Sequence, residues 1–191
     1  MTRGIERRHW LIAIGIAAAM AALLLWMGRP PTCTGGGGRP WTGAVQSPDN
    51  SQHLADWYTP SHVIHGFLFY ALGWLFLRRN HELVAMSPGH GCTVRGTAHQ
   101  FMGERYLAAV LIEAGWELLE NSQYIIDRYR EATFAFGYNG DSVINSLADV
   151  GWMSLGFLAA RRLPIRATIA IAVFFELLTL LTIPDNLTLN V

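Results

Sequence analysis

The chain has 191 residues, of which 51% are hydrophobic and only 15% are charged, and its formal net charge is zero. This composition is too apolar and too poor in charge for a typical soluble domain, and the balanced charge gives no reason to expect a nucleic-acid partner. The length suits one integral membrane domain, residues 1–191, and an all-α helical bundle is the fold class we expect.

The first predicted element is an uninterrupted apolar run over residues 10–27, preceded by three arginines. It resembles a signal peptide, but no small-x-small cleavage site follows it, so we expect an uncleaved membrane helix. Residues 28–59 contain Pro-Pro and the tract Gly35–Gly38 and are expected to form a loop. The next apolar run, 61–77, begins with His62 and His65.

Polar loops and apolar runs also alternate in the second half of the chain. A loop over 78–105 precedes an apolar run that carries several carboxylates, and a mixed segment, 127–140, is expected to be an interfacial turn or short helix. A short basic hinge separates the last two runs. The sequence therefore predicts five transmembrane helices, at 10–27, 61–77, 106–126, 143–160 and 167–183.

The arginines predict the orientation of these helices. Ten of the fourteen lie in the N-terminal segment, the 78–105 loop and the 161–166 hinge. Because basic residues favour the cytoplasmic side, we expect a cytoplasmic N-terminus, and five spans then leave the C-terminus outside. Cys33 then lies outside and Cys92 inside, so we expect no disulfide between them.

Ionisable residues in four of the predicted helices form the main functional signal. Glu113, Glu117 and Glu120 are spaced four and three residues apart, which places them on one helix face. At about 1.5 Å per residue, His65, Glu117, Asp149 and Glu176 all lie roughly 9–13 Å below the outer surface. Because a carboxylate facing lipid is costly, we expect these groups to meet in a polar pocket that opens outward.

Three interpretations of this pocket remain open. The polar groups can hydrogen-bond across helices and hold the bundle together. Carboxylates with imidazole can instead bind a divalent metal or act as general acid and base, so enzyme activity is left undecided. They can also form a path for protons or a solute, as intramembrane Asp, Glu and His chains do elsewhere.

Several motifs resemble a family of uncharacterised bacterial inner-membrane proteins. The similarity rests on five stretches after the first helix: Asn50–Thr59, Ser61–Tyr70, Glu117–Ser122, Gly140–Ser146 and Asp185–Asn190. The resemblance implies the inner-membrane location, but it implies no reaction.

A looser similarity is to VanZ-like membrane proteins, which have a His in an early helix, a Glu-rich helix and a late Asp-x-x-x-Asn pattern. The corresponding residues here are His62 or His65, Glu113 and Glu117, and Asp141 with Asn145. Because VanZ-like proteins are linked to glycopeptide-antibiotic tolerance, the likeness implies a ligand of the cell envelope.

We therefore expect a multi-pass protein whose outward-facing pocket binds or processes an envelope lipid headgroup or a similar precursor. A membrane scaffold or assembly factor and a proton-linked carrier are the alternatives. The residues expected to act as acid, base or central ligands are Glu117, Asp149, His65 and Glu120. Those expected to complete the ligand site are His62, Asn121, Asp141, Asn145, Glu113, Glu176, Arg128 and Arg130. A divalent metal, if bound, is expected on His62, His65, Glu117 and Asp149.

Overall fold

The computed structural model describes residues 4–33, 39–85, 101–132, 137–185 and 187–190. Within these residues all regular structure is helical, which confirms the predicted fold class. The helices are α1 (Arg7–Trp26), α2 (Thr59–Ala85), α3 (Met102–Glu120), α4 (Gln123–Ala132), α5 (Val143–Arg162), α6 (Ile165–Thr182) and α7 (Leu187–Asn190).

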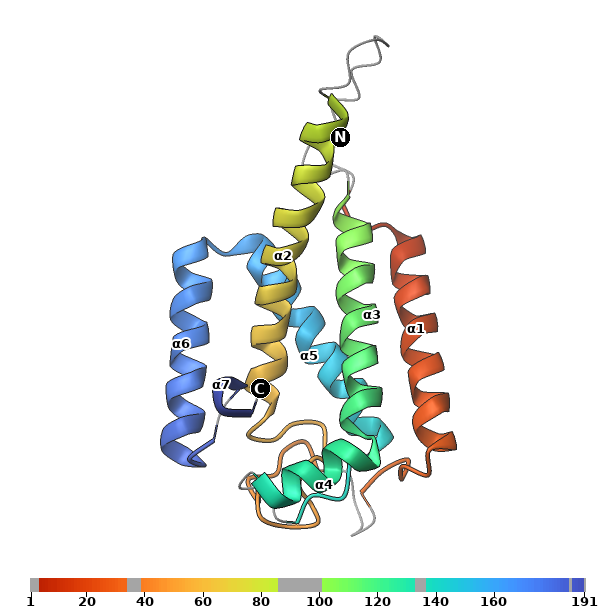
Figure 1. The fold of residues 1–191 in the computed structure, drawn as a ribbon, viewed down its shortest axis with the longest axis vertical. Coiled ribbons are helices and arrows are strands. Elements are labelled where there is room, and N and C mark those ends of the chain that lie inside the picture. The colour runs from red at the N-terminus through yellow and green to blue at the C-terminus, as the bar shows by residue number, and fades with distance from the viewer. Residues whose placement is uncertain (1–3, 34–38, 86–100, 133–136, 186, 191) are drawn as a thin grey trace.

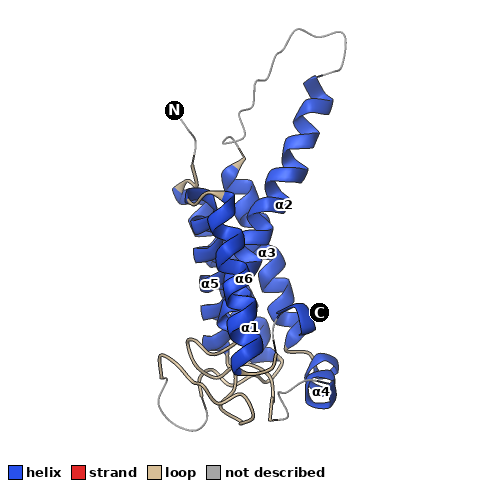
Figure 2. Cartoon of the chain, turned by 90° about the vertical axis from the view of Figure 1, so that its left-hand side faces the viewer, coloured by secondary structure: helices blue, strands red, loops and turns tan. Residues whose placement is uncertain are grey.

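The long helices form a bundle whose two ends differ. Helices α1, α2, α3 and α6 run along the long axis of the molecule, and α5 crosses obliquely behind α2 and α3 (Figure 1). Helix α4 and the 39–58 segment gather at one end, which we call the loop end (Figure 2). At the other end α1 begins at Arg7, α5 ends at Arg162 and α6 begins at Ile165, and we call this the arginine end (Figure 1).

Three of the described helices, α1, α5 and α6, are long and apolar enough to cross a membrane. Helix α6 exposes large side chains such as Leu177 (53%) and Leu181 (83%), as expected where lipid surrounds a helix. Helix α3 carries Glu113 and Glu117 in its interior, which lowers its hydropathy. Spans through α2 and α3, and the side of the membrane that each end faces, stay predictions.

The third predicted helix, 106–126, is shorter in the structure, because α3 ends at Glu120. The Asn121 side chain donates to the Glu117 carbonyl oxygen at 3.0 Å and to Asp141 Oδ2 at 2.7 Å. These bonds satisfy the last turn of α3 and tie it to the chain before α5. The chain then turns, and α4 runs across the loop end with Ile125 and Ile126 buried.

Helices α2 and α5 cross at very close range through two glycines. A Cβ atom added to Gly66 would lie 2.2 Å from the Met153 carbonyl oxygen, and one added to Gly156 would lie 2.2 Å from the Val63 carbonyl oxygen. Only glycine therefore permits this approach. The crossing sets the rotation of α2 against α5, and His62 and His65 lie within about one helical turn of it.

The loop before α2 is fastened to the N-terminus of α5. The backbone N–H groups of Val143 and Ile144 donate to the carbonyls of Pro30 and Pro31 at 2.9 and 3.2 Å, and that of Ser142 donates to Ser51 at 3.0 Å. These bonds satisfy donors that a helix leaves free at its start. They also hold the loop against the bundle at the loop end.

Candidate metal centre

The centre begins with a carboxylate on α3 that lies between two histidines of α2. The side chain of Glu113 is fully buried, and its Oε1 lies 2.7 Å from His62 Nδ1. His65 Nδ1 lies 3.0 Å from Oε2 of the same carboxylate. Because an ionised carboxylate only accepts hydrogen bonds, both imidazoles donate through Nδ1–H. In the neutral ring each Nε2 then keeps its lone pair, which is how metal-binding histidines are commonly oriented.

His62 directs this free nitrogen toward Asp149 of α5. His62 Nε2 and Asp149 Oδ1 are 3.8 Å apart, which is too long for a hydrogen bond. An ion held at about 2.0–2.2 Å by nitrogen and oxygen ligands spans a gap of that size. Glu117 Oε1 lies 3.7 Å from His62 Nδ1. Ligand atoms of His62, Glu117 and Asp149 all lie within 4.8 Å of one another, and we call these three residues the histidine trio.

Glu117 is the least satisfied member of the histidine trio. Its side chain is 0% exposed, and neither carboxylate oxygen has a hydrogen-bond partner among the residues that the structure describes. Burying an ionised carboxylate without a partner costs several kcal/mol or more, so such a group takes up a proton or a cation. The arrangement therefore favours a positively charged ligand beside Glu117.

A second group, the carboxylate trio, consists of Glu117, Glu120 and Asp141, again with ligand atoms within 4.8 Å of one another. Asp141 is held in place by Asn121, whose Nδ2 donates to Oδ2 at 2.7 Å, and by the Tyr138 hydroxyl, which donates to Oδ1 at 3.0 Å. Burial raises the pKa of Asp141 to about 6, although both hydrogen bonds act in the opposite direction. Asp141 lies before α5, at the loop end.

A small cavity of about 40 Å³ is bordered by His62 and Asp149 of the histidine trio and by Glu120 and Asp141 of the carboxylate trio, whereas Glu117 does not line it. Because a water molecule needs about 10–15 Å³, the cavity has room for about three water-sized particles. That volume suits ions with water, and it is much smaller than the several hundred Å³ of a typical small-molecule pocket. The residues that line the cavity are Asn50, Ser51, Asp56, Tyr58, His62, Glu120, Tyr129, Tyr138, Asp141 and Asp149.

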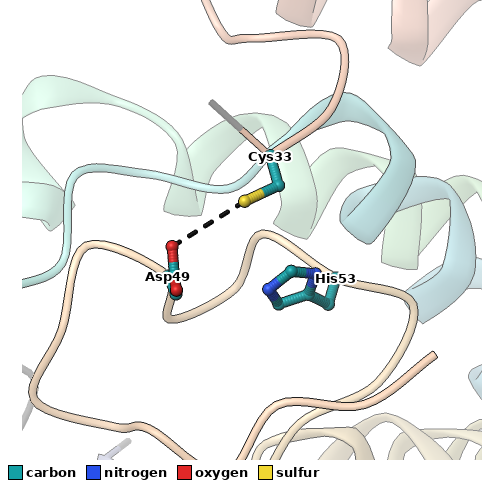
Figure 3. Close-up of side chains that lie close together, drawn as sticks. All are labelled: Cys33, Asp49 and His53. Atoms are coloured by element: carbon teal, nitrogen blue, oxygen red, sulfur yellow. Dashed lines mark hydrogen bonds between the residues drawn. The ribbon is translucent and has the colours of Figure 1, made fainter. Parts of the chain in front are cut away.

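A third cluster with metal-ligand side chains lies in the loop. Cys33 Sγ donates to Asp49 Oδ1 at 3.7 Å, and His53 lies beside them (Figure 3). His53 Nδ1 accepts from the Arg39 backbone N–H at 3.2 Å, so in the neutral ring the proton sits on Nε2. This tautomer offers no free lone pair and argues against a metal here.

Cys92 lies outside the described residues, so the absence of a disulfide stays a prediction.

The structure gathers most of the predicted site residues but separates four of them. Asn145 Nδ2 donates to the His53 carbonyl at 2.7 Å, so this amide holds the loop and does not orient a carboxylate of the site. Glu176 accepts from Thr188 Oγ1 at 2.5 Å, on α6, and belongs to none of the clusters described above. Arg128 is exposed, and Arg130 donates to the Tyr138 carbonyl at 2.6 Å.

Sequence reasoning missed the tyrosines of the site. Tyr58, Tyr129 and Tyr138 border the cavity, and burial raises the pKa of each hydroxyl above its usual value. They come from the residue just before α2, from α4 and from the segment before α5. No helical periodicity connects such positions. The available signal was the recurrence of Tyr near acidic residues in segments that looked interfacial.

The comparisons with known proteins agree with the motifs quoted above. The family model described as "Protein of unknown function (DUF2585)" matches residues 24–191. A UPF0314 protein of Rhizobium etli strain CIAT 652 is 48% identical over 187 residues, which cover 97% of this chain and 86% of the relative. A UPF0314 protein of Sphingopyxis alaskensis is 47% identical and covers 100% of this chain and 91% of its own. No solved structure matches.

Proposed function

Because the chain belongs to the DUF2585 family, whose description assigns no activity, we propose a function from the geometry of its buried centre. The protein binds a divalent transition-metal ion on the histidine trio, His62, Glu117 and Asp149. One imidazole with two carboxylates suits zinc, manganese or iron better than an all-oxygen ion such as calcium. Glu113 is not a ligand in this proposal, because it accepts hydrogen bonds from Nδ1 of His62 and His65 and so orients both rings.

One observation carries this proposal. Glu117 is a fully buried carboxylate with no hydrogen-bond partner among the described residues, and it lies next to an imidazole whose Nε2 is free. A cation resolves both features at once, because it neutralises the carboxylate and uses the lone pair. Three protein ligands leave at least one coordination position for an outside molecule.

The open position gives the ion a role beyond structure. The cavity lies at the loop end of the bundle, where we propose that the protein faces the periplasm. Through the bound ion the protein holds the polar tip of an envelope lipid headgroup or a similar ligand. The small cavity volume supports contact through the ion and water, because a whole headgroup does not fit inside it.

The decisive variant is Glu117→Gln in detergent-purified full-length protein. After loading with Zn²⁺ or Mn²⁺ and desalting, the wild-type protein should retain metal and Glu117→Gln should retain none. Glu113→Gln removes only the orienting carboxylate and should weaken metal affinity by about 10–100-fold. Glu131→Gln, at an exposed position of α4, should bind metal like the wild type. Native mass spectrometry of the same samples shows whether retained lipid leaves with the metal.

A scaffold function is the second candidate, and the loop contacts favour it. Gln52 Nε2 donates to the Gly140 carbonyl at 2.8 Å, and Asn145 ties α5 to His53, so part of the polar network holds the fold. A purely structural Glu117 predicts that Glu117→Gln lowers the thermal stability of the metal-free protein. A ligand role predicts equal or higher stability, because the variant removes a buried carboxylate that accepts no hydrogen bond in the described structure. Higher stability with lost metal binding would therefore exclude the scaffold reading for Glu117. The proton-linked carrier stays a prediction.

A further inference from the structure

A single ion on the histidine trio leaves several carboxyl groups of the centre without a metal. Five carboxylates meet here: Glu113, Glu117, Glu120, Asp141 and Asp149. Their ion-pair partners among the described residues are His62 and His65, and no arginine of the described chain pairs with them. One divalent cation supplies two positive charges for these five carboxyl groups, so the others are neutralised by protons or by a second cation.

Glu117 belongs to both trios, which is the geometric reason to consider a second ion. A carboxylate has two oxygens, and neither oxygen of Glu117 is hydrogen-bonded within the described structure. Sites with two metals hold their ions about 3.5–4 Å apart, often with a carboxylate between them. Buried at 0% exposure between the histidine trio and the carboxylate trio, Glu117 is placed as such a bridge.

The rest of the carboxylate trio is built to stay in place. Asn121 donates to Asp141 Oδ2, while Asn121 Oδ1 accepts from the Asp141 backbone N–H at 2.7 Å. The Tyr138 hydroxyl holds the other oxygen at 3.0 Å. Glu120 borders the cavity beside Asp141 and is hydrogen-bonded to Tyr129. Hydrogen bonds of this kind orient carboxylates that bind metals.

We propose that the centre is dinuclear: a second divalent cation lies on Glu117, Glu120 and Asp141, and Glu117 bridges it to the ion of the histidine trio. This inference rests on the proposed function, because it needs the first ion. The second position has oxygen ligands alone and therefore prefers a harder ion such as Mn²⁺ or Mg²⁺. Four of the five proposed ligands, His62, Asp149, Glu120 and Asp141, border the cavity of about 40 Å³, which has room for water on the ions. Such a pair can hold a phosphate or carboxylate between two metals, which makes an anionic headgroup the ligand class of the site.

The experiment is a titration of full-length, detergent-purified, metal-free protein with Mn²⁺ alone, read by bound metal per chain and by electron paramagnetic resonance. Wild-type protein should bind two ions per chain and give the broadened spectrum of two coupled Mn²⁺ ions. Asp141→Asn and Glu120→Gln should each bind one ion with an isolated six-line spectrum. Glu117→Gln should bind neither. Asp127→Asn, an exposed α4 carboxylate, should behave as the wild type.

The outcomes separate the two proposals. One ion in the wild type, unchanged in Asp141→Asn and Glu120→Gln, overturns the second site and leaves the first intact. No ion in the wild type overturns both. The use of two variants from different elements, α3 and the segment before α5, guards against a folding defect in either one. A variant counts only if its elution volume and helical content match those of the wild type.

Discussion

At the scale of single residues, the centre is defined by which carboxylate oxygens accept a hydrogen bond and which do not. Glu113 accepts from two imidazoles, whereas Glu117, one helical turn further along α3, accepts from none in the described structure. The two glutamates look alike in the sequence, but the structure gives them opposite roles. Glu113 orients the histidines, and Glu117 is the group that needs a cation.

The buried carboxyl group of Asp141 predicts a pH dependence of stability that can be measured. Its pKa is raised to about 6 by burial, above the 3.8 of an ordinary aspartate. Between these values Asp141 is protonated in the folded state and ionised in the unfolded state, so its contribution to stability should fall as pH rises from about 4 to about 6 and stay constant above. The difference corresponds to roughly 3 kcal/mol.

The measurement is the thermal midpoint of metal-free protein in detergent across this pH range. Asp141→Asn should lose a large part of the pH slope, because its side chain does not ionise. Burial also raises the pKa of Asp56, which adds a slope of the same sign, so the comparison is between variants and not with a flat line. Asp127→Asn, at an exposed position, should keep the wild-type slope. An Asp141→Asn curve that matches the wild type would contradict the assignment.

At the scale of elements, the crossing of α2 and α5 brings the histidines to the carboxylates. Gly66 lets the α2 backbone approach the Met153 carbonyl, and Gly156 lets α5 approach Val63. The rotation set by this contact places His62 between Glu113 and Asp149. A change in the crossing should therefore disturb the metal centre as well as the packing.

Gly66→Ala is the variant that tests the crossing. The added Cβ would lie 2.2 Å from a backbone oxygen, so the helices must separate, and we expect a loss of about 3 kcal/mol or more and a failure to retain metal. Gly115→Ala is the matched control, because a Cβ added there meets nothing within 4 Å. It should be neutral or stabilising by up to about 1 kcal/mol through helix propensity. Thermal unfolding in detergent measures both variants.

At the scale of the whole molecule, the two ends of the bundle carry different chemistry. The arginine end is formed by the start of α1 and the hinge between α5 and α6, and the loop end carries the 39–58 segment, α4 and the polar centre (Figure 1). The position of the loop end on the periplasmic side stays a prediction.

The two cysteines of the chain supply a test of this prediction. Cys33 is partly exposed at the loop end, so in a Cys92→Ser variant a membrane-impermeant maleimide should label it in intact spheroplasts. In the reciprocal Cys33→Ser variant, Cys92 should be labelled only after the membrane is permeabilised. Labelling in the opposite pattern would reverse the orientation, and the polar centre would then open to the cytoplasm.

The sequence predicted the helical class, the apolar runs and the face on which most site residues lie. Spacing of three and four residues placed His62 with His65, and Glu113 with Glu117, because a helix repeats every 3.6 residues. The length of the third helix was overestimated, since apolar residues continue to Ile126 while Asn121 ends the helix. Equal depth in the membrane did not bring Glu176 into the centre, because depth does not determine the direction in which a helix face points.

The sequence by itself determined which helix face is polar, because side-chain direction within one helix follows from local backbone geometry. Only the tertiary structure decided how those faces meet. The rotation of each helix depends on contacts between distant backbones, such as Gly66 against Met153, and these contacts select Glu113 as the partner of both histidines. They also leave Glu117 buried without a hydrogen bond in the described chain, and this isolation in a low-dielectric interior is the basis for proposing a metal.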